Sequence, residues 1–211
     1  MTVLTSVASV RWLEARVVRY GKEHKEATRR RIIETAGRRL KRDGIDGSGV
    51  ATLMADAGLT NGAFYAHFAS KEDLVATAVS EQLRGQREWL ASFPPGRDGV
   101  EQMVRAYLSP EHRDNPEEGC PSAALLDEIG RCADPAKESY TGGVLAVIDD
   151  IAARLAPQDP PSARVKTLGV YALMAGTLQL ARALADRELS GAVLEQGIRN
   201  ALMVLDAPPE R

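Results

Sequence analysis

The 211-residue chain is poor in the residues that carry most metal and redox chemistry, with two cysteines and three histidines. Cys120 and Cys132 are too far apart for a thioredoxin-like pair, and two cysteines make no disulfide framework, which fits a reducing cytoplasm. His24, His67 and His112 lie in unrelated stretches without the spacing of metal ligands. We therefore expect no metal site. The weaker alternative is a site built from His112, Cys120 and Cys132.

Long hydrophobic runs, alternating strand patterns and catalytic signatures are also missing. The longest uncharged run of the apolar C-terminal region, residues 167–181, has 15 residues, whereas a membrane-spanning helix needs about 20. The N-terminus MTVLTSVASV has no leading positive region, which disfavours a signal peptide. No Gly-rich phosphate loop, GxSxG or HExxH sequence occurs. These absences predict an all-α cytoplasmic protein that is not an enzyme, requires no cofactor and does not enter a membrane.

The net charge of −2 conceals an uneven distribution. Residues 1–70 carry 12 Lys and Arg against 7 Asp and Glu, whereas residues 71–211 carry 15 against 22. A basic N-terminal part on an acidic remainder is typical of a protein that meets a polyanion at one end. The alternative is that surface charge varies along the chain without a function.

Residues 47–74, GSGVATLMADAGLTNGAFYAHFASKEDL, have the outline of a helix-turn-helix. Gly58 suits the left-handed residue that ends a helix, and Thr60 carries a side-chain oxygen that can cap the next one. Ser48 is placed to cap the first helix and leave its amide groups free for a phosphate. The first helix would bury an apolar stripe at i, i+3, i+4 and i+7, namely Val50, Leu53, Met54 and Ala57.

The second helix of this motif would bury Phe64 and Phe68, which are four residues apart, and expose small or hydrogen-bonding side chains. Such a face can approach phosphates and base edges closely, because Asn61 can donate and accept and Ala63 can contact a thymine methyl group. The exposed face comprises Thr60, Asn61, Gly62, Ala63, Tyr65 and His67.

The string AGLTNGAFYAHFASKEDL, preceded by TRRRIIETAGRRLKRDG at residues 28–44, closely resembles the DNA-binding domain of the TetR family of one-component transcriptional regulators. The resemblance implies a three-helix DNA-binding domain followed by a helical domain that binds a ligand and forms a dimer. It also implies that Ser48 and Lys71 hold the DNA backbone and that Arg29 contacts a phosphate. The residues expected at the DNA are Arg29, Ser48, Thr60, Asn61, Gly62, Ala63, Tyr65, His67 and Lys71.

We divide the chain into an N-terminal extension (1–22), a helix-turn-helix DNA-binding domain (23–70, with the motif at about 49–68) and a helical regulatory and dimerisation domain (71–211). The extension is either a frayed terminus or a basic arm on the DNA, with Arg16, Arg19, Lys22 and Lys25 as its cations. A helix capped by Ser70 and running from Lys71 to about Phe93 belongs to both domains, so it can transmit movement between them.

The third part should contain further helices separated by breaks at residues 94–99 and 109–119, and residues 109–119 are expected to form a loop. Pro121 suits the first turn of the following helix. Two long helices are expected at residues 135–156 and 162–186, and a last one at 189–205.

The middle helices should enclose a mostly apolar ligand pocket, and the alternative for each candidate is a place in the hydrophobic core. Glu128 is a carboxylate on an apolar face, so it requires a partner from the protein or from the ligand. Cys120 is interpreted as a buried thiol, with a redox or electrophile sensor as the alternative. The pocket candidates are Trp89, Phe93, Met103, Tyr107, Leu125, Glu128, Ile129, Tyr140, Val144 and Met174.

Small and apolar residues on the last two helices permit close packing, either within the monomer or against a second copy related by twofold symmetry. A dimer would also match the two half-sites of a palindromic operator. The candidates for this interface are Leu168, Tyr171, Ala172, Ala175, Gln179, Leu194, Ile198, Leu202 and Leu205.

The sequence thus predicts a homodimeric repressor that binds double-stranded operator DNA and is released by a small hydrophobic ligand. Release requires that the ligand prefer the conformation that does not bind DNA. One alternative is a helical small-molecule-binding or enzymatic protein that no longer uses its DNA-binding domain. The other is an architectural DNA-binding protein without an effector.

Overall fold

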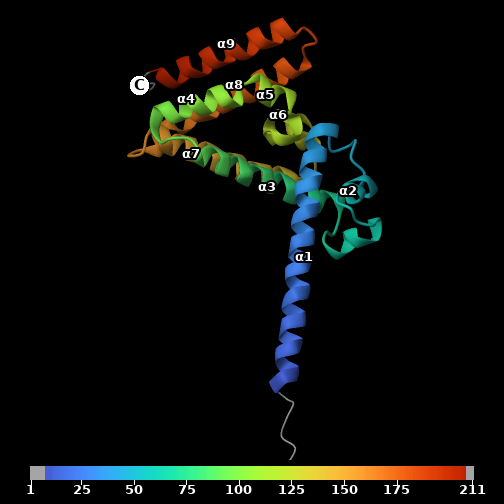
Figure 1. The fold of residues 1–211 in the computed structure, drawn as a ribbon. Helices are drawn as coiled ribbons and strands as arrows, with labels where there is room; N and C mark the ends of the chain where they lie inside the picture. Colours follow the sequence, from blue (N-terminus) through green and yellow to red (C-terminus); the bar gives the residue numbers. More distant parts are fainter. Residues whose placement is uncertain (1–7, 208–211) are drawn as a thin grey trace, which may run out of the picture.

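The computed structural model describes the backbone of residues 8–207 and the side chains of residues 23–207. Every regular element in that part of the chain is a helix, as predicted (Figure 1). The elements are α1 (Ala8–Asp43), α2 (Val50–Asp56), the 3₁₀-helix η1 (Asn61–Ala66), α3 (Lys71–Ala91), α4 (Gly96–Tyr107), α5 (Pro110–Asp114), the 3₁₀-helix η2 (Pro116–Glu118), α6 (Pro121–Arg131), α7 (Asp134–Leu155), α8 (Pro160–Ala183) and α9 (Arg187–Asp206).

The N-terminal domain forms around apolar side chains from α1, α2 and η1. Ile32 and Leu40 of α1 and Leu53 of α2 are fully buried, and Phe64 and Phe68 enter the same core. Arg39 fastens α2 to α1, because its guanidinium pairs with Asp43 and Asp56. The predicted basic arm in residues 1–22 lies outside the side chains that the structure describes.

Two glycines end the first helices, and the one at Gly58 was predicted. Gly44 follows α1 with φ 82°, and Gly58 follows α2 with φ 66°, in the left-handed region that favours glycine. The predicted cap of α2 is wrong. Gly49 precedes that helix, and buried Ser48 donates from Oγ to Gly44 O at 2.7 Å.

The segment that the sequence predicted as the second helix of the motif forms the short 3₁₀-helix η1, which we call the recognition segment. The side chain of Thr60 makes no capping hydrogen bond to η1. A helix of six residues that include Gly62 is too short to be stable as an α-helix by itself. Packing against the rest of the domain therefore determines its backbone conformation.

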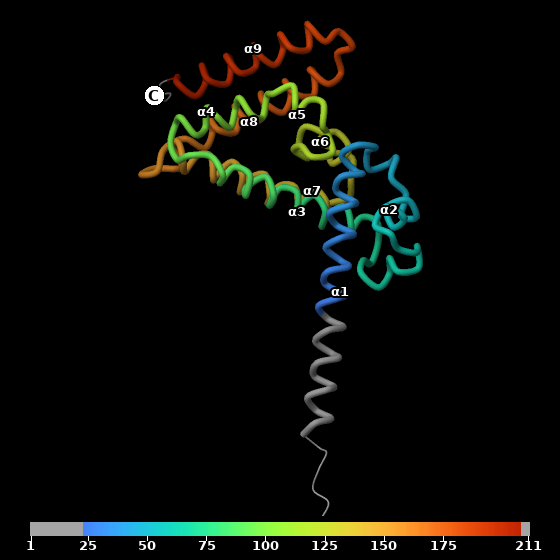
Figure 2. The backbone as a smooth tube through the Cα atoms, in the orientation of Figure 1, coloured from blue at the N-terminus to red at the C-terminus, as the bar shows by residue number. Residues whose placement is uncertain are grey.

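The shared helix α3 begins as predicted. Ser70 Oγ accepts a hydrogen bond from Asp73 N at 3.2 Å, and Glu72 and Asp73 occupy the first turn, where the helix dipole favours acidic groups. The start of α3 packs on α1, and the rest lies along α7 (Figure 2). Gly143 of α7 allows close approach, since an added Cβ would lie 2.6 Å from Leu83 Cδ1.

The expected loop at residues 109–119 is instead mostly helical. Ser109 Oγ accepts a hydrogen bond from His112 N at 3.1 Å, and Pro110 begins α5 in the first turn, where proline needs no amide partner. Pro116 begins η2 in the same way. Pro121 begins α6, and α7, α8 and α9 lie within a few residues of their predicted bounds.

The outer pair of the C-terminal domain is α8 with α9 (Figure 1). Gly197 of α9 meets Thr177 of α8, because a Cβ added to this glycine would lie 2.4 Å from Thr177 Cγ2. In the described part of the chain, no helix combines the length and apolar character that crossing a membrane requires.

Candidate DNA-binding surface and ligand cavity

The 3₁₀-helix η1 exposes polar side chains and buries aromatic ones. Thr60 and Asn61 are exposed, and Tyr65 is 74% exposed. Phe64 is buried, and its ring stacks on that of Phe68 with 5.7 Å between centroids. The aromatic core therefore fixes the direction in which the exposed residues point.

Arg29 of α1 holds the end of this segment. Its guanidinium lies 4.2 Å from the centroid of the Phe68 ring and donates a hydrogen bond to His67 O. Burial, together with the positive charge of Lys25 and Arg29, lowers the pKa of His67 from its usual value. Arg29 thus has partners inside the protein, and its phosphate contact stays a prediction.

Two other predicted DNA contacts also have partners inside the protein. Lys71 Nζ donates to Ile45 O at 2.6 Å, and Ser48 is fully buried. Both stabilise the turn between α1 and α2. The remaining six predicted contacts lie together around η1: Thr60, Asn61, Gly62, Ala63, Tyr65 and His67.

Helix α6 attaches the C-terminal domain to the same turn. Glu128 Oε2 accepts hydrogen bonds from Ile45 N at 2.6 Å and from Asp46 N at 3.1 Å. The partner that this carboxylate requires is therefore the backbone of the N-terminal domain, and Glu128 does not line the larger cavity. Glu128 lines a smaller cavity of about 330 Å³ between the two domains.

The larger cavity has a volume of about 800 Å³ and lies between α1, α3, α4 and the segment from Ser109 to Cys120. Of the predicted pocket residues, Trp89 and Tyr107 line it. Tyr140 packs on the core and shares a hydrogen bond with Ser122. The other predicted residues pack in or against the core: Phe93, Met103, Leu125, Ile129, Val144 and Met174.

Most of the residues that line the cavity were not predicted from sequence, and several of them are polar. The polar composition of residues 109–119 could have indicated those in that segment, but it suggested a loop. The lining residues missed by the sequence analysis are Lys41, Gln82, Gly85, Gln86, Ala106, Ser109, Glu111, His112, Asn115, Glu118, Gly119 and Cys120.

The neutral ring of His112, at the cavity wall, is held in one tautomer. Its Nε2 accepts a hydrogen bond from Cys120 N at 3.0 Å, and its Nδ1 lies 2.7 Å from Tyr107 O. A backbone N–H can only donate, so the proton of the neutral ring is on Nδ1. Burial and the nearby charges of Arg182 and Lys41 lower the pKa of His112 to about 4, although the bond to Tyr107 O opposes this shift.

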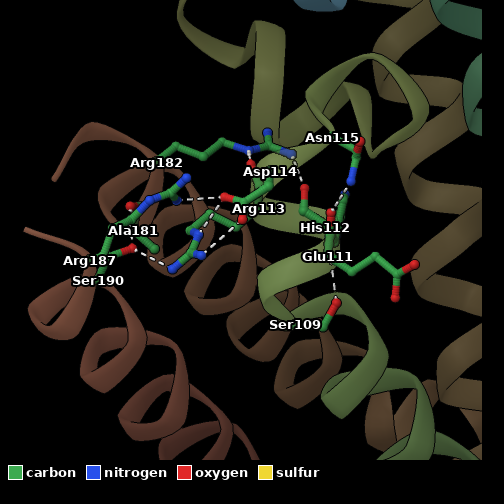
Figure 3. A network of polar contacts seen from close by, with 10 residues as sticks. All are labelled: Ser109, Glu111, His112, Arg113, Asp114, Asn115, Ala181, Arg182, Arg187 and Ser190. Atoms are coloured by element: carbon green, nitrogen blue, oxygen red, sulfur yellow. Dashed lines mark hydrogen bonds and ion pairs between the residues drawn. The ribbon is translucent and has the colours of Figure 1, made fainter. Parts of the chain in front are cut away.

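Arg182 of α8 organises the backbone beside this histidine (Figure 3). Its guanidinium donates to His112 O at 2.7 Å, Ala123 O at 3.0 Å and Arg113 O at 3.1 Å. Arg113 in turn donates to Ser190 Oγ at 3.0 Å, which joins α5 to α9. Burial lowers the pKa of Arg182 from its usual value.

Cys120, at the cavity wall, is buried in a polar network. Its thiol donates to Gln86 Oε1 at 3.3 Å and lies 3.4 Å from the hydroxyl of Tyr171. Ser122 Oγ lies 2.8 Å from the same Tyr171 hydroxyl and 2.9 Å from that of Tyr140. The network joins α3, α6, α7 and α8, which gives this thiol a structural role.

Within residues 23–207, no group of three or more His, Cys, Asp or Glu side chains is arranged to hold a metal ion.

Comparison with known proteins agrees with this geometry. The family model described as "Bacterial regulatory proteins, tetR family" matches residues 32–78. The chain is 34% identical over 87 residues to the HTH-type transcriptional regulator TtgR of Pseudomonas putida, and 33% identical over 87 residues to the probable regulator ArpR of the same species. Each alignment covers 41% of this chain and 41% of the relative, well under two thirds of its length.

Solved structures share the fold over most of the chain. The reduced form of NemR from E. coli has a TM-score of 0.70 at 19% identity, covering 83% of this chain and 95% of that one. A TetR-family regulator from Agrobacterium tumefaciens has a TM-score of 0.68 at 20% identity, covering 83% and 98%. The sequence of residues 32–78 thus matches the tetR family of bacterial regulatory proteins, and the chain shares its fold with solved structures that include a TetR-family regulator.

Proposed function

We propose that the chain is a homodimeric transcriptional repressor that binds a palindromic operator through η1 and releases it when a small molecule occupies the 800 Å³ cavity. The observation that carries the proposal is the exposed surface of Thr60, Asn61 and Tyr65 on a rigid aromatic base. Residues 60–68 contain no acidic side chain, so nothing in the segment repels a phosphate.

Exposed apolar residues on α8 and α9 support the dimer. Val165 is 80% exposed and Met203 is 70% exposed, and Leu180 and Leu168 are also exposed. Such surface is unfavourable in water unless a second copy covers it. Four residues predicted at this interface are buried within the protomer and drop out of it: Tyr171, Ala175, Leu194 and Leu205. Leu168, Ala172, Gln179, Ile198 and Leu202 remain exposed or half-buried.

The position of the cavity supports regulation by a ligand. Lys41 belongs to α1 of the N-terminal domain, whereas Trp89 belongs to α3, which enters both domains. An occupant would therefore contact both domains, and it would shift the equilibrium if it prefers the arrangement that does not bind DNA. This favours an effector-controlled regulator over an architectural protein.

The proposal is tested with the DNA upstream of the gene for this chain. Tyr65→Ala should weaken binding by about 10- to 100-fold, because it removes an exposed contact worth ~1–3 kcal/mol. Fluorescence anisotropy at fixed salt measures the affinity, and Gln102→Ala on the exposed face of α4 is the control. The wild-type chain binding no fragment of that DNA at low ionic strength, or Tyr65→Ala binding as tightly as wild type, would refute the assigned surface.

A further inference from the structure

Two half-buried cations lie at or near the large cavity: Lys41 lines it, and Arg182 lies beside Gly119 of its wall. Lys41 Nζ donates to Gly119 O at 2.8 Å, and Arg182 donates only to backbone carbonyls. Among the side chains of residues 23–207, neither cation forms an ion pair. A cation taken partly out of water is costly unless a negative charge lies near it, so this wall is suited to an anion.

The carboxylates around these cations are engaged elsewhere or face solvent. Glu118 pairs with Arg38 at 3.3 Å, and Asp114 pairs with Arg113 at 2.8 Å and with Arg187 at 2.6 Å. Glu111, the other acidic residue at the cavity, is exposed.

The titration of Lys41 reflects the same surroundings. Burial lowers its pKa to about 8, and the charges of Arg38 and Arg182 act in the same direction. Glu118 and Cys120 act in the opposite direction and offset part of the shift. His112 faces the same region and is neutral, because its pKa is about 4.

Lys41 has donors to spare for a bound molecule. Its ammonium group carries three N–H bonds, and the structure uses one of them, toward Gly119 O. The lining also includes two aromatic residues, Trp89, which packs edge-on against Phe93 at 4.8 Å between centroids, and Tyr107. The Tyr107 hydroxyl is buried and makes no hydrogen bond to any of the described residues.

We infer that the cavity binds a small organic acid, with its carboxylate at Lys41 and its apolar body against Trp89 and Tyr107. This rests on the proposed function and names the chemical class of its effector. It narrows the hydrophobic ligand predicted from sequence to an amphipathic anion. The acid would take a donor of Lys41 that Gly119 O leaves free, so its binding acts directly on α1.

The inference is tested by calorimetry on the full chain without DNA, with matched pairs of an acid and its neutral amide: benzoate and benzamide, 2-naphthoate and 2-naphthamide, octanoate and octanamide. At least one acid should bind about 10-fold more tightly than its amide at pH 7, the usual scale for a charge-assisted hydrogen bond. This preference should fall between pH 7 and pH 9.5, because Lys41 loses its proton while the carboxylate stays charged. Amide binding should not change over that range.

Two variants separate charge from structure. Lys41→Met should abolish the preference for the acid, whereas Lys41→Arg should keep it and remove its pH dependence, because arginine stays protonated. Lys137→Met, on the exposed face of α7, is the control and should behave as wild type.

Three results would overturn the inference. The first is that no pair prefers its acid, and the second is that Lys41→Met keeps the preference. The third is inorganic phosphate binding as tightly as the best acid, which would show an anion site without a role for Trp89 and Tyr107. The calorimetry contains no DNA, so its outcome does not depend on whether the chain binds an operator. Conversely, a failure to bind acids would not show that the chain cannot bind DNA.

Discussion

Gly44 and Gly58 end α1 and α2 with similar left-handed φ values, but their surroundings differ. A Cβ on Gly44 would lie 2.8 Å from Glu128 Oε1, whereas one on Gly58 would meet nothing within 4 Å. Gly58→Ala should therefore lower the free energy of unfolding by about 1–2 kcal/mol through backbone strain alone. Gly44→Ala should lower it further, because the carboxylate that binds Ile45 N and Asp46 N must also move.

Urea unfolding of the purified variants measures both effects. Gly130→Ala is the control, since Gly130 lies exposed within α6 with no neighbour within 4 Å of an added Cβ, and alanine favours a helix over glycine. Equal losses for Gly44→Ala and Gly58→Ala would show that the contact with Glu128 adds nothing.

Residue type alone predicted the role of Gly58 but not the partner of Ser48. A left-handed helix end has a local cause, so the sequence next to it is sufficient to predict it. Ser48 is buried and donates to the carbonyl of Gly44, and Arg29 donates to a carbonyl 38 residues away in sequence, which the fold brings to it. A serine or arginine in a DNA-binding motif does not reveal whether protein or phosphate is its partner.

At the scale of elements, α6 links the C-terminal domain to the turn after α1. Glu128→Gln should weaken the hydrogen bonds to Ile45 N and Asp46 N by removing the charge of the acceptor, at a cost of roughly 1–2 kcal/mol. Hydrogen exchange of these two amides should accelerate more than exchange in the α1 core near Ile32. Asp127→Asn, which loses only the exposed pair with Arg131, is the matched control.

Slower or unchanged exchange at Ile45 and Asp46 in Glu128→Gln would contradict a fastening role for α6. An equal acceleration in Asp127→Asn would assign the effect to net charge instead of to the junction.

Helix periodicity predicted the long elements well, but not the cavity between them. α3, α7, α8 and α9 each bury an apolar face that their own sequence displays. The cavity collects residues from α1, α3, α4 and residues 109–120, and many of them are polar. Such residues fall outside every apolar stripe, so a search along apolar faces selected core residues such as Leu125 and Met174 instead.

At the scale of the whole molecule, the contacts between the two domains converge on a small region. Lys41 binds Gly119 O, Glu128 binds Ile45 N, and Lys71 binds Ile45 O. The first of these contacts is at the large cavity, and the other two hold the turn that precedes α2. A change at the cavity can therefore reach the recognition segment through a short path on α1 and its turn.

The opposite end of the molecule should form the dimer. Val165→Glu combined with Met203→Glu places two charges on the exposed apolar surface of α8 and α9, and burying them unpaired would be costly. Sedimentation should show twice the protomer mass for wild type and the protomer mass for the double variant, with loss of tight binding to a palindromic operator. Leu126→Glu, at an exposed leucine of α6, is the control and should remain dimeric. If the double variant is still a dimer, the interface lies elsewhere. If the wild-type chain is a monomer, it cannot bind the two half-sites of a palindromic operator as a twofold dimer.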